Sequence, residues 1–231
     1  MAGPEVRRRP FVLLSVAVSV DGAMDDAGAE RLVLSGAADL DRVDEVRAGC
    51  DAILVGAETL RRDDPRLLVR SARRRADRVS RGLPEHPLKV TVTGSGDLDP
   101  ELRFWHHGGD KLVLTTDGAV ARVRGTLGDF ADVAGTGPEV DWGRALDLLG
   151  ERGIGRLLVE GGGRVHTQLL ALDLADELHL AVAPLLVGQA GAARFLYPAD
   201  YPGGPAARMR LLEARAVGEI ALLRYAPKDR R

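Results

Sequence analysis

The sequence predicts an α/β protein with a mixed, mainly parallel sheet, and three observations lead to this fold class. Short apolar runs alternate with helical patterns from Phe11 to about Val182, which favours a sheet that helices cover on both faces. Three glycines, Gly161–Gly163, join one apolar run to a helical pattern. Near the C-terminal end, Gly218-Glu219 separates two β-rich runs, which predicts a final antiparallel hairpin.

The elements follow in order along the chain. Six apolar, β-branched runs of strand length are expected as strands: Phe11–Val18, Ala52–Val55, Leu88–Val92, Lys111–Thr115, Arg156–Val159 and Glu177–Val182. The hairpin joins Met209–Val217 to Ile220–Tyr225. Helical spacing predicts Ala37–Ala48, a short helix that starts near a capping Thr59, a helix capped by Asp141 that runs to about Arg152, and Val165–Leu172.

Composition narrows the class of protein. Of 231 residues, 45% are hydrophobic and 29% are charged, which is ordinary for a globular protein, and residues 1–231 are expected to form one domain with a core of about 10–226. The net charge of −2 gives no field that would recruit nucleic acid or a membrane surface. With Cys50 alone, no internal disulfide or Cys-rich zinc site can form, and no histidine has zinc-site spacing, so no metal is expected. The sequence shows no signal peptide and no membrane span, so we expect a cytoplasmic protein.

The most informative segment is the glycine turn, Val159-Glu160-Gly161-Gly162-Gly163-Arg164-Val165-His166. Glycines between a strand and a helix allow close backbone approach, and the helix start offers free N–H groups and a positive dipole end. This pattern favours a bound pyrophosphate, and a plain tight turn is the alternative. His166 would lie near such a cofactor, whereas His179, in an apolar strand, is expected in the core or at an interface.

Two further segments carry candidate chemistry. Asp21-Gly22 ends the first strand and marks either a ligand site or a turn without one. In the second segment, Gly56 to Arg70, adjacent Asp63 and Asp64 would diverge in a helix and form no carboxylate dyad, and Arg70 could bind phosphate or form a salt bridge. For each of these charges, a surface position is the alternative.

Basic residues also gather just beyond this segment. Residues 70–81 hold six arginines, which form either a solvated helix or loop, or a lip that attracts a phosphorylated ligand. Arg47 is sufficiently explained as a cation at a helix C-terminus. Phe195–Pro205 is expected to be a loop that acts as a lid or an interface. The chain lacks a P-loop, a Gly-x-Ser-x-Gly elbow and the zinc deaminase signature, which excludes those reaction classes.

Taken together, these segments resemble the reductase domain of the riboflavin-biosynthesis RibD proteins, within the dihydrofolate-reductase-like superfamily, from Phe11 to Tyr225. The segments that carry the resemblance are Ser19-Val20-Asp21-Gly22, Arg47 to Gly56, Thr59 with Asp63-Asp64-Pro65-Arg66-Leu67 and Arg70, and Val159-Glu160-Gly161-Gly162-Gly163 with Asp176-Glu177-Leu178 downstream.

The resemblance implies a mixed, mainly parallel sheet of about nine strands flanked by helices. It also implies NADPH as hydride donor, a homodimer, and reduction of the ribosyl group of a ribosylaminopyrimidine 5′-phosphate to ribityl, the 5-amino-6-(5-phosphoribosylamino)uracil reductase type. The implied cofactor contacts are Ala17, Thr59, Asp63, Gly161, Gly162, Gly163, Arg164, Val165 and His166. The implied substrate contacts are Arg47, Leu67, Arg70 and Glu160, and Asp63 and Glu160 are the candidate proton handlers.

The sequence departs from the family pattern at three positions on the expected substrate side. Ala23 replaces a basic residue, Val33 replaces a tryptophan, and Arg31 stands where a small polar residue is common. The changes leave two alternatives open: a related reductase that acts on another pyrimidine or a pterin such as dihydrofolate, and a nucleotide-binding protein without turnover. The deaminase domain that many family members carry is expected to be absent.

Overall fold

The computed structural model describes residues 9–28 and 32–228, and the chain divides into two compact units. Unit 1 contains the chain up to Phe11 together with Ala48–Leu157, and unit 2 contains Val12–Arg47 and the chain from Leu158 onward. The nine strands belong to one mixed sheet in which most neighbours are parallel. This confirms the predicted fold class, and each unit is described by itself below.

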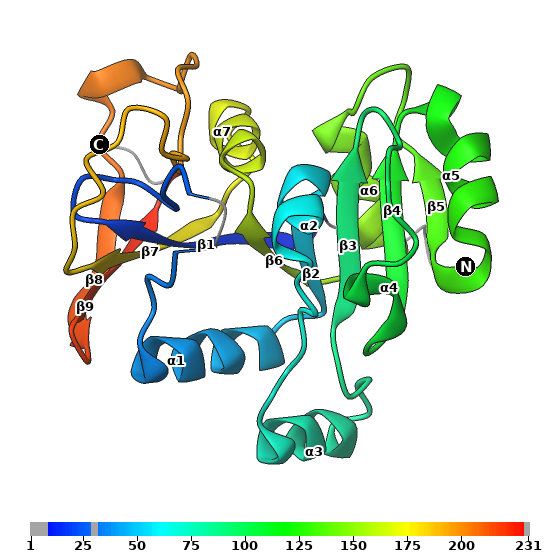
Figure 1. Ribbon diagram of the computed structural model, residues 1–231, viewed down its shortest axis with the longest axis horizontal. Coiled ribbons are helices and arrows are strands. Elements are labelled where there is room, and N and C mark those ends of the chain that lie inside the picture. Colours follow the sequence, from blue (N-terminus) through cyan, green and yellow to red (C-terminus); the bar gives the residue numbers. More distant parts are fainter. Residues whose placement is uncertain (1–8, 29–31, 229–231) are drawn as a thin grey trace, which may run out of the picture. The chain divides into compact units, whose positions relative to one another are not determined.

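The strands of unit 1 are all parallel and follow the order β5-β4-β3-β2. Their bounds are β2 Ala52–Gly56, β3 Leu88–Thr93, β4 Lys111–Thr115 and β5 Asp132–Gly135. Every residue of β2 is buried, as expected of a strand with helices on both faces. Figure 1 shows β3, β4 and β5 side by side, with α5 beside β5.

Helices connect these strands. Their bounds are α2 Ala57–Asp63, α3 Ala72–Ser80, α4 Arg103–His106, α5 Val120–Leu127 and α6 Trp142–Glu151, with short 3-10 turns at Asp117–Ala119 and Gly128–Phe130. Asp141 caps α6 as predicted, since its side chain accepts a hydrogen bond from the Arg144 backbone N–H at 2.9 Å.

Unit 2 holds the strands β1 Phe11–Ser19, β6 Arg156–Gly161, β7 Glu177–Ala183, β8 Arg210–Val217 and β9 Ile220–Ala226 in the order β6-β1-β7-β9-β8. The β1–β7 pair is parallel, whereas β9 pairs antiparallel with both β7 and β8, which confirms the predicted hairpin. The helices α1 Ala37–Ala48 and α7 Gly163–Ala171 lie on opposite sides of these strands (Figure 1). In unit 2, Leu34, Ala181 and Leu222 belong to one buried apolar cluster.

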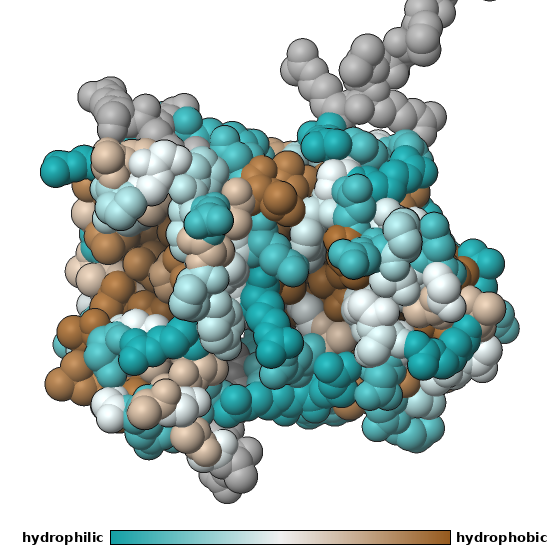
Figure 2. Space-filling model, turned by 90° about the horizontal axis from the view of Figure 1, so that it is seen from above, coloured by the Kyte–Doolittle hydropathy of each residue, from teal (hydrophilic) through white to brown (hydrophobic). Residues whose placement is uncertain are grey.

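Apolar side chains are exposed along the edge strand of unit 2. Met209, Leu211 and Leu212 are 40%, 51% and 37% exposed, and β8 has a neighbour on one side only. Figure 2 shows brown atoms gathered at its left, the end of unit 2 where Figure 1 places β8 and β9. Exposed apolar residues on an edge strand are typical of a surface that pairs with another chain.

Candidate functional site

The glycine turn joins β6 to α7 in unit 2. Gly162 has φ +93° and ψ +107°, a conformation in which any other L-residue is strained. Gly162 is also the N-cap of α7, and no side chain caps the N–H groups of the first helical turn. A helix that begins with uncapped N–H groups is a favourable place for an anion.

Gly163 is needed for a different reason. A Cβ atom at this position would collide with the backbone carbonyl oxygen of Arg194 and would lie 2.9 Å from a ring carbon of Tyr197. Residues 194–197, called the strap below, therefore pack directly on the start of α7. The Tyr197 N–H donates to Thr167 Oγ1 at 2.9 Å, and that hydroxyl donates to the Gly163 carbonyl at 2.7 Å. The last two glycines of the turn thus serve backbone conformation and close packing respectively.

The turn after β1 is fastened to the same part of the chain. The Asp21 carboxylate accepts hydrogen bonds from Ser19 Oγ at 2.6 Å and from the backbone N–H groups of Val187 at 3.0 Å and Gly188 at 2.8 Å. These bonds, that from Ser19 first, hold the pKa of Asp21 well below its ordinary value. The Arg194 guanidinium in turn donates to the Asp21 carbonyl. This arrangement favours the interpretation of Asp21-Gly22 as a structural turn that positions the strap.

Arg47 and Glu160 form a bidentate ion pair in unit 2. Arg47 lies in the last turn of α1 and Glu160 in β6, and Arg47 Nε and Nη2 each donate to a different Glu160 oxygen at 2.6 Å. The side chains are only 16% and 11% exposed. Burial lowers the pKa of Arg47, but the charge and hydrogen bonds of Glu160 outweigh burial and hold this pKa above its ordinary value. A carboxylate with both oxygens held in this way acts as an acceptor that orients other groups.

The remaining predicted residues of unit 2 differ in exposure. Ala17 is half-buried in β1 opposite Ala181, Arg164 is exposed, and Val165 is buried. His166 is fully buried, and neither ring nitrogen makes a hydrogen bond within the described residues. Burial lowers the pKa of His166 to about 4, and the Val159 backbone offsets this only in part. His166 is therefore a neutral histidine of the interior.

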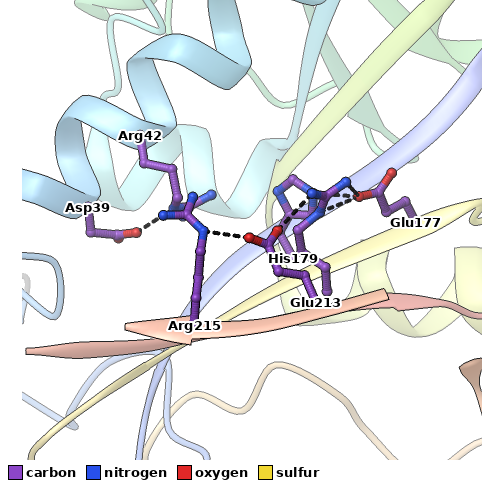
Figure 3. A network of polar contacts seen from close by, with 7 residues as sticks. Asp39, Arg42, Glu177, His179, Glu213 and Arg215 are labelled. Carbon is purple, nitrogen blue, oxygen red and sulfur yellow. Dashed lines mark hydrogen bonds and ion pairs between the residues drawn. The ribbon is translucent and has the colours of Figure 1, made fainter. Parts of the chain in front are cut away.

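Polar contacts also link the far strands of unit 2, as Figure 3 shows. The Glu177 carboxylate accepts from His179 at 2.8 Å and from Arg224 at 2.7 Å, and Arg224 also donates to Glu213 at 2.8 Å. His179 is 6% exposed, and burial lowers its pKa in spite of Glu177. The burial of His179 agrees with the expected core or interface position, and within β7 it pairs with Glu177, which Arg224 links to β9.

In unit 1, α2 carries two of the predicted cofactor contacts. The helix begins at Ala57 with Gly56 as N-cap, so the prediction that Thr59 caps it is wrong. The chain enters the helix directly from β2, which places half-buried Thr59 inside the first turn instead. Asp63 is the last helical residue and is half-buried, while Asp64 turns away into the left-handed region at φ +39° and pairs with Arg103 at 2.7 Å. The two carboxylates therefore form no dyad, as predicted.

The basic stretch that follows is mainly a helix, α3. Arg70 is exposed just before it, and Leu67 is buried with φ +48°. Arg78 is 1% exposed and donates to the carbonyls of Ala48 and Cys50 at 2.9 and 2.8 Å, which makes it a structural residue. The solvated-helix interpretation therefore holds for most of this stretch, with Arg78 as its buried exception.

Of the three departures from the family pattern, two are described by the structure. Ala23 is fully buried and forms an isolated β-bridge with Arg194, so the short side chain at this position suits the interior. Val33 is 74% exposed. Arg31 lies outside the described residues.

Sequence reasoning did not identify Arg194 or Lys89. Arg194 holds the Asp21 turn from a loop that is distant in sequence, and Lys89 is buried inside β3 with its ammonium bonded to backbone carbonyls. The one signal for Lys89 is a charged residue at the start of an apolar strand. Within residues 9–28 and 32–228, the structure shows no cluster of three or more metal-ligating side chains. The described helices include none that is long and apolar enough to cross a membrane.

Known protein structures have a similar fold. The solved structure of Acinetobacter baumannii RibD superimposes with a TM-score of 0.78 over 94% of this chain at 24% identity, and this chain spans 58% of that one. The diaminohydroxyphosphoribosylaminopyrimidine deaminase/5-amino-6-(5-phosphoribosylamino)uracil reductase of Thermotoga maritima gives a TM-score of 0.74, and this chain spans 57% of its length. The fold is therefore that of the matched parts of these two proteins.

Sequence comparison identifies the family within this fold. Residues 10–223 match the RibD C-terminal domain family, and the chain belongs to that family. The chain is 35% identical over 181 residues to the 2,5-diamino-6-ribosylamino-4(3H)-pyrimidinone 5′-phosphate reductase of Archaeoglobus fulgidus, a match that covers 78% of this chain and 83% of that protein. It is 31% identical to the reductase of the same name from Methanothermobacter thermautotrophicus, over 95% of this chain and 99% of that protein.

Proposed function

We propose that this protein is a nicotinamide-dependent reductase that converts the ribosyl group of a ribosylaminopyrimidine 5′-phosphate to a ribityl group in riboflavin biosynthesis. The observation that carries the proposal is the likeness, over most of both chains, to two relatives named as reductases of such a compound. Fold alone would not support it, since one fold hosts many reactions.

The residues at the glycine turn fit a dinucleotide cofactor. Gly162 starts α7 in a conformation that glycine favours, and no side chain caps the N–H groups of the first helical turn. A pyrophosphate is the group that such N–H groups would hold. We propose NADPH as this cofactor, with contacts from Gly161, Gly162, Gly163 and the following residues through His166, and from Ala17, Thr59 and Asp63. When bound, a reduced nicotinamide would supply hydride to C1′ of the ring-opened ribosylamine, an imine carbon, and the proton that follows would go to the nitrogen.

We assign Arg47, Glu160, Leu67 and Arg70 to the substrate. Exposed Arg70 supplies a cation for a phosphate, which arginine binds in bidentate fashion. Glu160, with both oxygens on Arg47, is suited to orient a hydroxyl or amino group through its remaining lone pairs. Asp63, a half-buried carboxylate at the end of α2, is the second candidate, with Glu160, for handling the proton that follows the hydride.

The names of the two relatives sharpen the choice of substrate. Both names contain a compound with an amino group at position 2 of the pyrimidine, where a uracil carries a carbonyl. We therefore propose the 2,5-diamino compound as the preferred substrate and the deaminated uracil compound as the second candidate. The buried Ala23 supports a substrate pocket without the basic residue that the family pattern would place there.

The test is NADPH oxidation, followed by absorbance, with the two pyrimidine phosphates, dihydrofolate and a no-substrate control in parallel, and with NADH in place of NADPH in a second series. Turnover on either pyrimidine supports the proposal, and the ratio of kcat/KM decides between them. Turnover on dihydrofolate alone would establish a changed substrate, and cofactor binding without any turnover would establish a nucleotide-binding protein.

We also propose a homodimer and treat residues 10–223, which match a single family, as one functional domain. The exposed Met209, Leu211 and Leu212 on the edge strand support self-association. Light scattering of the native protein distinguishes monomer from dimer. The cytoplasmic location stays a prediction.

A further inference from the structure

Unit 1 contains a strained segment that includes Leu67 and Arg70, two of the residues assigned to the substrate. Asp64 and Leu67 are both non-glycine residues at positive φ, +39° and +48°, only three positions apart. Each residue of this kind costs about 1 kcal/mol or more, and such a conformation persists only where the surrounding structure enforces it. Residues 64–70, called the bent segment below, must therefore be held in place by contacts from elsewhere in unit 1.

One end of the bent segment is held by Asp64 itself. Its carboxylate accepts from Arg103 Nε at 2.7 Å and, at 3.3 Å, from the backbone N–H of Phe104 in α4. The other end is held by Arg75, whose guanidinium donates to the carbonyls of Val69 at 3.2 Å and Arg70 at 2.6 Å. Neither contact fixes the middle of the segment.

The middle is held by Lys89. This lysine is fully buried in β3, and its Nζ donates to the Arg66 carbonyl at 3.3 Å, to the His107 carbonyl at 2.6 Å and to the Phe104 carbonyl. Nζ also lies 4.4 Å from the centre of the Phe104 ring. The three N–H groups of an ammonium match these three carbonyls, so each donor has an acceptor. Because Arg66 immediately precedes Leu67, this contact fixes the backbone at the second strained residue.

We propose that Lys89 is a positioning residue that preorganises the bent segment, and with it Leu67 and Arg70, for the phosphorylated substrate. The inference rests on the proposed function only for the roles of Leu67 and Arg70. The physical argument is that burying a charged side chain costs free energy, which its hydrogen bonds must offset. Burial and, to a lesser degree, the nearby ammonium of Lys111 lower the pKa of Lys89 to about 7, against the opposing effect of Asp64.

The chain offers a matched control. Lys111 is the register partner of Lys89 on the neighbouring strand β4 and donates to one carbonyl, that of Gly108, at 3.1 Å. This hydrogen bond goes to a residue outside the bent segment, so Lys111→Met removes a lysine from the same place in the sheet. Lys89→Met removes all three donors, Lys89→Gln keeps two donors on a shorter side chain, and Lys89→Arg restores a long cation with enough donors.

The first readout needs no substrate. The native protein is digested briefly with trypsin, and mass spectrometry gives the rate of cleavage after Arg66. This rate is divided by the rate of cleavage after Arg81, an exposed reference site beyond α3. We expect this ratio to rise about tenfold in Lys89→Met, because a buried carbonyl that loses its donor shifts a local opening equilibrium by roughly that factor. We expect a smaller rise in Lys89→Gln, a return toward wild type in Lys89→Arg, and no change in Lys111→Met.

The second readout separates positioning from general stability. Lys89→Met should raise KM for the pyrimidine phosphate about tenfold, with a smaller change in kcat and in NADPH affinity, and Lys89→Arg should recover KM. An unchanged cleavage ratio in both Lys89→Met and Lys89→Gln, or the same rise in Lys111→Met, would overturn the inference. Absence of turnover in the wild type would overturn the proposed function alone, since the cleavage ratio tests Lys89 without substrate.

Discussion

The ion pair between Arg47 and Glu160 can be tested by measuring the coupling free energy between the two side chains. Their two hydrogen bonds of 2.6 Å are charge-assisted, and the side chains are 16% and 11% exposed. Hydrogen bonds to charged groups contribute about 1.5–3 kcal/mol each where they are buried, and residual solvent screening reduces this. We therefore expect a coupling free energy of about 2 kcal/mol between the two side chains.

The assay is a double-mutant cycle of Arg47→Met, Glu160→Gln and the double variant, with the free energy of unfolding measured by urea denaturation. The control is the Arg144–Glu151 pair on α6, which has a similar distance of 2.7 Å but side chains that are 47% and 46% exposed. Exposed pairs couple by about 0.5 kcal/mol or less. A coupling between Arg47 and Glu160 no larger than that of the control would refute the reasoning, because the ion pair would then not order this part of unit 2.

Three further outcomes are expected. Gly162→Val should raise the Kd for NADPH by about tenfold or more, whereas Gly153→Val, at another turn of positive φ (+80°) with open space around it, should leave that Kd unchanged. Arg70→Ala should raise the KM for the substrate about tenfold with a smaller effect on NADPH affinity, whereas the control Arg73→Ala, on exposed α3, should not raise this KM. Equal losses of affinity for both ligands would assign Arg70 to the cofactor. The folded-state pKa of Asp21 is lowered, so its contribution to stability is present above the unfolded value of 3.8 and is lost as pH falls through the folded value. Acid denaturation curves of Asp21→Asn should therefore be flatter than those of the wild type in this range, and superimposable curves would contradict this account.

The regular part of the fold could be predicted from the sequence because it depends on local patterns. The predicted strand Phe11–Val18 is observed as Phe11–Ser19, and the predicted helix Val165–Leu172 as Gly163–Ala171. By contrast, β5 Asp132–Gly135 and α5 Val120–Leu127 were not predicted. β5 has four residues of which one is buried, and α5 contains a glycine near its end, so neither carries a strong periodic signal.

The site residues divide in the same way. The glycine turn could be found because its sequence is local, and Arg47 and Glu160 were named through the family resemblance. Their pairing, however, joins residues 113 positions apart, and no local pattern encodes such a contact. Arg194 was missed for the same reason, since it reaches the Asp21 turn across 173 positions. The error at Thr59 has a local cause: a threonine is a good cap, but the helix begins directly after the buried strand, whose last residue, Gly56, is the N-cap.

The glycine turn also shows how structural and functional demands coincide at one place. Gly162 is needed for a backbone angle and Gly163 for the approach of Arg194, so neither residue by itself requires a ligand. These two demands do not explain why no side chain caps the N–H groups at the start of α7. A capping residue would stabilise the helix by about 1 kcal/mol. The strap packs on the same turn, so the start of α7 combines a fixed backbone with N–H groups that no side chain caps. That is the physical reason to place the cofactor pyrophosphate there, and the Gly162→Val and Gly153→Val comparison tests it apart from backbone strain.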